Sequence, residues 1–245
     1  MKMIISRVKN FLSWLINTLV PLRCGICGTY TDASHTLCPE CFAKLRFITK
    51  PCCPICGRPF EYEVAKDVIC GTCLKQKPIY QTARAAMVYD DISKELIIPF
   101  KHGDRTDLSP LLVKFLYQCG LDMFSKIDLI MPVPLHQFRL MKRKYNQSAL
   151  LASGLSKKTH IPYEPYLLRR HKSTKSQGHL NSKERAKNVL NAFRVVHTDR
   201  IKNKIILLVD DVYTTGATVN ACAKALLNAG AKEVHVLTVC RVVHD

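Results

Sequence analysis

A five-residue apolar run, Ile205–Val209, is followed directly by two aspartates and by a loop of small residues that ends at Thr218. A continuous apolar run predicts a parallel strand that is buried on both faces. Apolar residues recur at helical spacing from Val219, and Gly230 stands where that helix would end. The loop is therefore predicted to join a strand to the amino end of a helix, where free N–H groups and the helix dipole favour a phosphate.

The residues around this loop have the chemistry of a sugar-phosphate site. The threonines offer hydroxyl donors, and Gly216 allows a close backbone approach. The aspartates can accept hydrogen bonds from vicinal hydroxyls or hold a hydrated Mg²⁺. A plain alternative is that the segment only turns the chain and caps the helix. The segment resembles the phosphoribosyl pyrophosphate loop of type I phosphoribosyltransferases, which implies Mg²⁺ with phosphoribosyl pyrophosphate as ligand. The ribose and phosphate site that it implies comprises Asp210, Asp211, Thr214, Thr215, Gly216, Ala217 and Thr218.

Eight of the twelve cysteines form four C-x-x-C pairs in the amino-terminal part of the chain. Two such pairs can supply the four thiolates of a closed structural zinc site, so two Zn²⁺ sites are predicted. Sequential pairing of the pairs and a crossed arrangement both remain open, and redox dithiols are the competing interpretation. The predicted zinc ligands are Cys24, Cys27, Cys38, Cys41, Cys53, Cys56, Cys70 and Cys73.

The first residues form an amphipathic stripe with positive charge near one end. Docking of this helix on the zinc domain is expected, with association at the inner-membrane surface as the alternative, because basic flanks and Trp14 suit a headgroup region. No small-residue cleavage site follows the apolar stretch 11–20, which is too short to span a bilayer. A cytoplasmic protein, peripheral to the inner membrane in the alternative case, is therefore expected.

Beyond Cys73 the composition becomes that of an α/β domain in which strands and helices alternate in the doubly wound manner. An edge strand is predicted at 84–89, a first core strand at 127–133, a short strand at 165–168, and further sheet strands at 204–209 and 233–239. The predicted fold class is α/β, a type I phosphoribosyltransferase-like sheet with covering helices, preceded by a small cysteine-rich zinc-binding domain. The predicted division is an amphipathic helix at 1–21, a double zinc-ribbon domain at 22–78 and a phosphoribosyltransferase-like domain at 79–245.

Further motifs narrow the resemblance to the competence protein ComF family, also called ComFC or GntX-like. They are the segments 139–147, 167–170 with Gln177, and 184–193, and with the four cysteine pairs they cover nearly the whole chain. The resemblance implies a protein of natural transformation that handles incoming single-stranded DNA, together with other transformation proteins. It also implies auxiliary or pyrophosphate-loop residues, namely Lys101, Arg139, Arg143, Asn146 and Gln147.

The charge independently favours a polyanionic partner. The formal net charge is +18, and eleven lysines and arginines against two acidic residues lie between Arg169 and Lys204. Such a segment neutralises backbone phosphates without reading sequence, and Phe138, Tyr145 and Tyr163 are candidates for base stacking. A merely solvated basic face is the alternative. The predicted nucleic-acid contacts are Arg169, Arg170, Lys172, Lys175, Lys183, Arg185 and Lys187.

Two functions from different classes follow. The first is a DNA-handling protein in which the phosphoribosyl pyrophosphate-type pocket is a ligand or terminal-phosphate site. The second is an active transferase that attaches ribose 5-phosphate to an unidentified base. The first is favoured because the cysteine knuckles offer no obvious pocket for a base. A transcription factor is disfavoured because the sequence shows no helix-turn-helix pattern.

Overall fold

The computed structural model describes residues 22–135, 145–171 and 192–243, and the predicted amphipathic helix at 1–21 lies outside them. Contacts divide the chain into two compact units, with the boundary between Leu45 and Arg46. The first four-cysteine group thus falls in the first unit, whereas the second group shares a unit with the α/β sheet. Each unit is described by itself.

The first unit is a cysteine knuckle followed by the short helix α2 (Pro39–Lys44). Gly28, at φ 75°, makes the tight turn of the knuckle and donates its N–H to the carbonyl of Cys24. Cys38 caps α2, and its sulfur accepts a hydrogen bond from the N–H of Cys41. This small unit buries little besides its cysteines, so a bound metal is the expected source of its stability.

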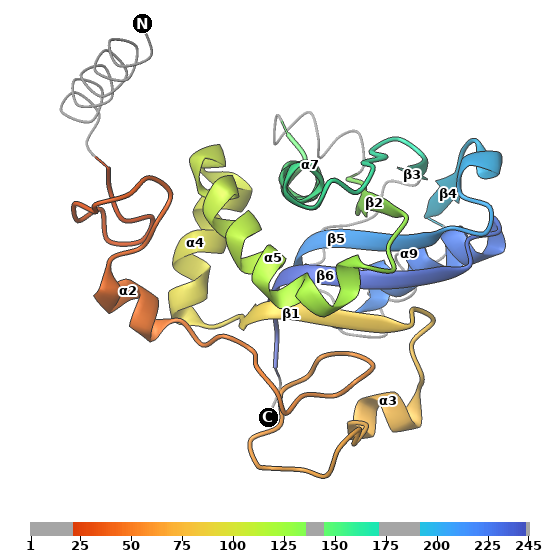
Figure 1. Cartoon of the computed structure of the whole chain (residues 1–245), viewed down its shortest axis with the longest axis horizontal. Coiled ribbons are helices and arrows are strands. Elements are labelled where there is room, and N and C mark those ends of the chain that lie inside the picture. The colour runs from red at the N-terminus through yellow and green to blue at the C-terminus, as the bar shows by residue number, and fades with distance from the viewer. Residues whose placement is uncertain (1–21, 136–144, 172–191, 244–245) are drawn as a thin grey trace, which may run out of the picture. The chain divides into compact units, whose positions relative to one another are not determined.

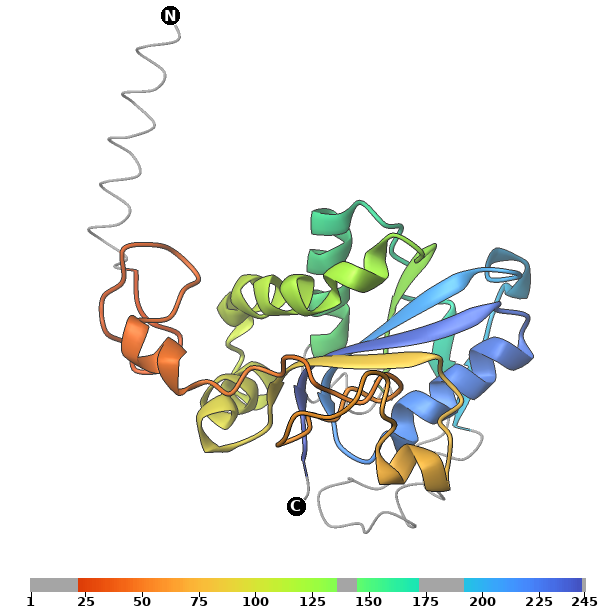
Figure 2. The same cartoon turned by 60° about the horizontal axis from the view of Figure 1, so that its bottom comes forward.

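The second unit is built on a parallel sheet of four strands in the order β1-β6-β5-β2 (Figure 1). Its strands are β1 (Thr82–Val88), β2 (Leu129–Pro132), β5 (Ile205–Tyr213) and β6 (Glu233–Arg241). The helices α5 (Ser109–Phe124) and α7 (Gln147–Thr159) cover one face, and α9 (Ala217–Asn228) covers the other (Figure 2). A parallel sheet with helices on both faces confirms the predicted α/β class.

The remaining elements surround this sheet. They are α3 (Gly71–Lys75), α4 (Asp91–His102), the 3₁₀ turns η1 (Thr106–Leu108) and η3 (Thr198–Arg200), and an antiparallel pair, β3 (Leu168–Arg170) with β4 (Phe193–Val195). A capping box opens α4, in which the Asp90 carboxylate accepts the N–H of Ser93 and the Ser93 hydroxyl accepts that of Asp90.

Three predicted strands differ from those observed. The short strand predicted at 165–168 is instead β3 (Leu168–Arg170), which pairs with β4 outside the four-stranded sheet. The prediction ended the strand of the aspartates at Val209, but β5 continues to Tyr213 because β6 supplies pairing partners as far as Arg241. The segment 127–133 was predicted to be the first core strand, and β2 is buried there but stands last in the four-stranded order, with only a single bridge from Ile130 to Tyr163 on its other edge. Because β2 stops opposite Val209, both aspartates extend beyond its end.

Candidate functional site

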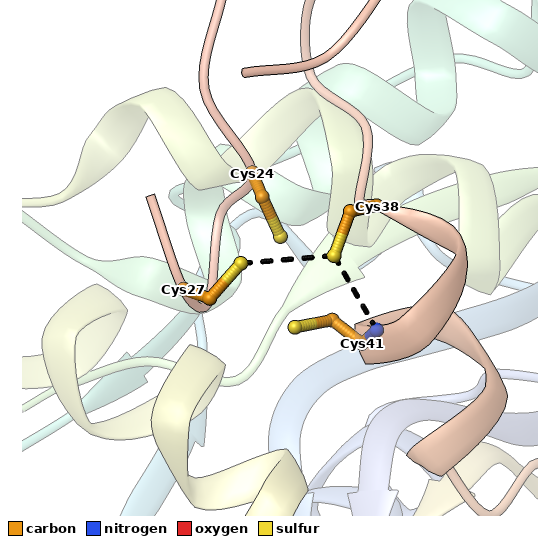
Figure 3. A group of neighbouring side chains, drawn as sticks. All are labelled: Cys24, Cys27, Cys38 and Cys41. Atoms are coloured by element: carbon orange, nitrogen blue, oxygen red, sulfur yellow. Dashed lines mark hydrogen bonds between the residues drawn. The ribbon is translucent and has the colours of Figure 1, made fainter. Parts of the chain in front are cut away.

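The cysteines form two separate groups of four in sequential order. In each group the four sulfur atoms lie within 4.8 Å of one another. In the first group Cys27 Sγ is 3.6 Å from Cys38 Sγ (Figure 3), and in the second Cys56 Sγ is 3.6 Å from Cys70 Sγ. Tetrahedral Zn²⁺ with bonds of about 2.3 Å separates its sulfur ligands by about 3.8 Å, so both groups fit the ion. This arrangement confirms the sequential pairing that the sequence left open.

Two arginines hold the second cysteine group against the sheet. Arg241, the last residue of β6, donates from Nη1 to the carbonyl oxygen of Cys56 at 2.6 Å and from Nη2 to its sulfur at 3.5 Å. Arg84 on β1 donates to the carbonyl oxygen of Pro54 at 3.0 Å. The N–H of Ala83 also donates to the carbonyl oxygen of Ile55 at 2.6 Å. The segment that holds the second cysteine group, residues 53–73, is called the second ribbon below. It is bound near the amino end of β1 and at the carboxyl end of β6.

The two metal centres should differ in what their loss does to the protein. Purified protein is expected to contain two zinc ions per chain by elemental analysis. A Cys24→Ser/Cys27→Ser variant should lose one ion and keep the α/β unit folded. The matched Cys53→Ser/Cys56→Ser variant should also lower the unfolding temperature of that unit, because the ribbon packs against β1 and β6. Protein purified without chelator that holds no zinc would contradict the assignment.

The two aspartates at the end of β5 bind to two different helices. Lys101, at the end of α4, pairs with Asp211 at 3.0 Å to Oδ2 and 3.1 Å to Oδ1. The hydroxyl of Ser148, in the first turn of α7, donates to Asp210 Oδ1 at 2.8 Å. The same oxygen accepts the N–H of Asp211 at 2.9 Å. The acidic pair thus joins three segments that lie far apart in the sequence, and the structure brings the predicted auxiliary residue Lys101 to it.

Burial and the neighbouring charge of Asp211 raise the pKa of Asp210 to about 7, against the opposing effects of Ser148 and Lys101. The folded protein therefore binds the Asp210 proton more tightly than the unfolded chain does. The stability that depends on this proton is present below the ordinary carboxyl pKa and falls as pH rises towards 7.

Asp210→Asn is consequently expected to raise the unfolding temperature by a few degrees at pH 8 and by less at pH 5.5. Asparagine keeps the acceptor oxygen that Ser148 uses, so the packing should survive. Thermal unfolding at both pH values measures the effect, and Asp199→Asn on the exposed turn η3 removes the same charge as a control. An equal gain at the two pH values would contradict the raised pKa.

The loop after β5 has the geometry that its residues predict. Gly216 caps α9 with a φ of 77°. A Cβ at this position would clash with the hydroxyl oxygen of Tyr213, so both the backbone angle and the packing require glycine. Thr214, Thr215, Ala217 and Thr218 are half-buried around the amino end of this helix. The N–H of Ala217, the first residue of α9, donates to the Thr215 hydroxyl at 3.4 Å, and the predicted role of this loop towards a phosphate stays a prediction.

Tyr213 connects this loop to the second ribbon. Its hydroxyl lies 2.7 Å from that of Tyr80, and the Arg241 guanidinium lies 4.3 Å from the centre of its ring. The buried guanidinium therefore contacts both Cys56 and the ring of Tyr213, the last residue before the loop.

The predicted auxiliary residues Asn146 and Gln147 lie at the start of α7. The Asn146 amide accepts the N–H of Ser148 and donates to the carbonyl oxygen of Val133. Gln147 donates to the carbonyl oxygen of Lys101 at 2.9 Å. Both residues thus support the acidic pair through Ser148 and Lys101, and their predicted role towards pyrophosphate stays a prediction. Arg139 and Arg143 lie outside the described residues.

The predicted nucleic-acid residues are described only in part. Arg169 is exposed on β3, whereas Arg170 is buried with its guanidinium 5.5 Å from the centre of the Phe193 ring. Lys172, Lys175, Lys183, Arg185 and Lys187 lie outside the described residues, as does Phe138. Tyr145 and Tyr163, which were candidates for base stacking, donate their hydroxyls to the carbonyl oxygens of Phe100 and Ala149.

Sequence reasoning did not single out Ser148 or Arg241. Ser148 is one of several serines in its helix, and only the fold places it opposite Asp210. Arg241 had a detectable signal, because a cation directly follows the apolar residues Val239 and Cys240. A buried charge at the carboxyl end of a parallel strand indicates a specific partner.

Comparisons with known proteins agree with these observations. Residues 15–74 match the double zinc ribbon domain, and residues 146–245 match the phosphoribosyl transferase domain. Competence protein F of Haemophilus influenzae is 33% identical, over 89% of this chain and 96% of that protein. DNA utilization protein YhgH of Escherichia coli K12 is 31% identical, over 91% and 99%. Competence protein ComFC of Bacillus subtilis 168 is 30% identical, over 84% of each chain.

These matches confirm the predicted phosphoribosyltransferase-like fold class with its preceding cysteine-rich region. Among the described helices, none has the length and apolarity that a membrane crossing needs.

Proposed function

The chain belongs to the family of competence protein F and ComFC, and on that premise we propose that it handles single-stranded DNA that enters the cell during transformation. In this proposal the site at the end of β5 binds phosphoribosyl pyrophosphate or a terminal phosphate of similar chemistry. The reducing cytoplasm, where thiols remain available for zinc, is the proposed location. Association with other transformation proteins belongs to the same proposal.

The observation that carries the pocket assignment is the placement of the acidic pair beside the phosphate loop. Asp210 and Asp211 extend past the end of β2, and Gly216 caps α9 five residues after Asp211. Vicinal hydroxyls of a ribose are suitable donors to carboxylates, and the loop offers N–H and hydroxyl donors to its 5-phosphate. Mg²⁺ that enters with the pyrophosphate would neutralise part of the negative charge of the pyrophosphate. The carboxylates of Asp210 and Asp211 are the groups that would bind the water molecules around this Mg²⁺.

The support for DNA comes from charge and from the relatives. A formal net charge of +18 favours a polyanion, and two relatives are named for competence and one for DNA utilization. Contacts to backbone phosphates make the affinity for DNA depend on salt concentration but not on base sequence.

Fluorescence anisotropy with labelled single-stranded oligonucleotides of different sequence tests the DNA proposal. The affinities are expected to agree within a few-fold and to fall by roughly 0.7 log units per log unit of salt for each phosphate contacted. Oligonucleotides with a 5′-phosphate should bind more tightly than those with a 5′-hydroxyl, and excess phosphoribosyl pyrophosphate should cancel the difference. Absence of binding at low salt would contradict the proposed function.

The second candidate is an active transferase, and the Lys101–Asp211 ion pair favours it. Cations in such a site can stabilise the negative charge of a departing pyrophosphate. Release of pyrophosphate from phosphoribosyl pyrophosphate with Mg²⁺ and a panel of bases decides between the candidates. Turnover that disappears in Lys101→Met would favour the transferase, whereas binding without turnover would favour the ligand site.

A further inference from the structure

A cavity of about 600 Å³ lies in the second unit, alongside the outer face of α9. Its other walls come from α3 and residues 76–79, which follow the second cysteine group, and from the start of β4. Thr214 and Thr215 of the phosphate loop lie at its margin. The cavity is therefore next to the site at the end of β5, but neither aspartate of that site lines it.

Helical spacing on α9 explains why this face is hollow. Val219, Cys222, Ala223 and Leu226 face the core, so the residues between them face the cavity. Alanines at 217, 221 and 225 leave room there, while Asn220 accepts the N–H of Ile79 at 2.9 Å and ties the two walls together. Small side chains and a link across the groove are consistent with a preformed site.

Positive charge lines this cavity on several sides. Arg58, Lys77, Lys224 and Arg241 are among its lining residues, and the described lining holds no aspartate or glutamate. The predicted zinc ligands Cys56 and Cys73 also line it, and Arg241 contacts Cys56, so Arg58, Lys77 and Lys224 supply the positive charge that is not already paired with a thiolate there. Lys77 and Lys224 are exposed on opposite walls. The Nε of Arg241, a residue only 7% exposed, has no hydrogen-bond partner among the described residues. This arrangement predicts an anionic occupant with more than one phosphate.

The aromatic rings at the cavity are already covered. Arg241 lies over Tyr213, and Arg170 lies over Phe193. Stacking of bases on these rings is therefore not expected, and recognition would rest on the phosphates alone.

We propose that this groove, bounded by α3, α9 and the phosphate loop, binds the backbone of single-stranded DNA. The inference rests on the proposed function and assigns the DNA path to residues outside the segment 169–187. A strand is favoured over a free nucleotide because Lys77 and Lys224 stand on separate walls, where successive phosphates can be neutralised. The strand end lies towards Thr214 and Thr215, which connects this groove with the phosphate loop.

A matched pair of double variants of the full, zinc-loaded chain tests the proposal. Lys77→Gln/Lys224→Gln removes two charges from the groove, and Lys75→Gln/Lys232→Gln removes two exposed charges on or beside the same helices. The probe is a labelled twelve-nucleotide oligo(dT), titrated at several salt concentrations. The groove variant should bind about tenfold more weakly, and its salt slope should fall by about 1.4, or about 0.7 for each phosphate that the variant no longer neutralises. The control variant should stay within about twofold of the unchanged protein.

Each other outcome is decisive. Equal losses of affinity in the two variants, or no loss in either, would overturn the groove assignment while leaving DNA binding itself established. Failure of the unchanged protein to bind the oligonucleotide would overturn the proposed function and this inference together. Displacement of the oligonucleotide by thymidine 5′-monophosphate at equal nucleotide concentration would assign the groove to a free nucleotide instead of a strand. Unfolding temperatures of both variants should match that of the unchanged protein.

Discussion

Replacement of both Asp210 and Asp211 by asparagine is expected to lower the Mg²⁺-dependent affinity for phosphoribosyl pyrophosphate by about a hundredfold. Loss of charge-assisted hydrogen bonds to the ribose and of the charge that attracts hydrated Mg²⁺ accounts for about 3 kcal/mol. Asparagine has nearly the same volume and keeps acceptors for Ser148 and for the backbone N–H, so the end of β5 should remain folded.

Isothermal titration calorimetry measures this effect, with circular dichroism as the check on folding. A Glu61→Gln/Glu95→Gln variant removes the same charge from two exposed positions and serves as the control. The aspartates are assigned to the ribose and Mg²⁺, whereas the loop after β5 is assigned to the terminal phosphate. The asparagine variant should therefore keep most of its affinity for the DNA backbone. Unchanged affinity for phosphoribosyl pyrophosphate would remove the ribose role of the acidic pair.

The second large effect is expected at Arg241. Arg241→Met should weaken phosphoribosyl pyrophosphate binding by about tenfold and also speed the loss of zinc from the second cysteine group. The guanidinium binds the carbonyl oxygen and the sulfur of Cys56 and lies over the Tyr213 ring, whose hydroxyl packs against Gly216. Without this guanidinium, both Tyr213, which packs against Gly216, and the zinc ligand Cys56 lose a contact that holds them in place.

Arg84→Met is the matched control, because Arg84 also binds the second ribbon through Pro54 but does not contact Tyr213 by ring stacking. It should speed zinc release to a chelator, followed with a colorimetric zinc indicator, and leave ligand affinity within about twofold. Equal loss of affinity in the two variants would show that the ribbon as a whole, and not Arg241, supports the loop. If both variants keep the phosphoribosyl pyrophosphate affinity of the unchanged protein, the second ribbon does not support the loop.

Sequence alone predicted the features that depend on neighbours along the chain. The cysteine spacing predicted both metal groups, and the apolar run before the aspartates predicted the strand, loop and helix from Ile205 to Asn228. These motifs can be recognised in the sequence because each needs particular residues at particular backbone angles, such as glycine at position 216 with its φ of 77°. The end of β5 was predicted four residues early because polar residues interrupt its apolar run, although β6 still pairs with them.

Interactions between distant segments were not predictable in this way. Lys101 reaches Asp211 across 110 positions, and Arg241 reaches Cys56 across 185. The apolar pattern of β2 also does not say whether one edge or both are paired, since burial of the faces is what the pattern reports. Ser148 became visible only once α7 was placed next to β5.

The attachment of the second ribbon to the sheet has a consequence for anyone who shortens the chain. A fragment that begins at Arg46 keeps every partner of Arg241 and Arg84 described above and should express as a folded body. A fragment that begins at residue 79, the boundary predicted from the sequence, lacks Cys56 and Pro54, to which Arg241 and Arg84 donate. Such a fragment would leave both guanidinium groups without these partners and would expose the apolar surface around Tyr80, and we expect it to aggregate.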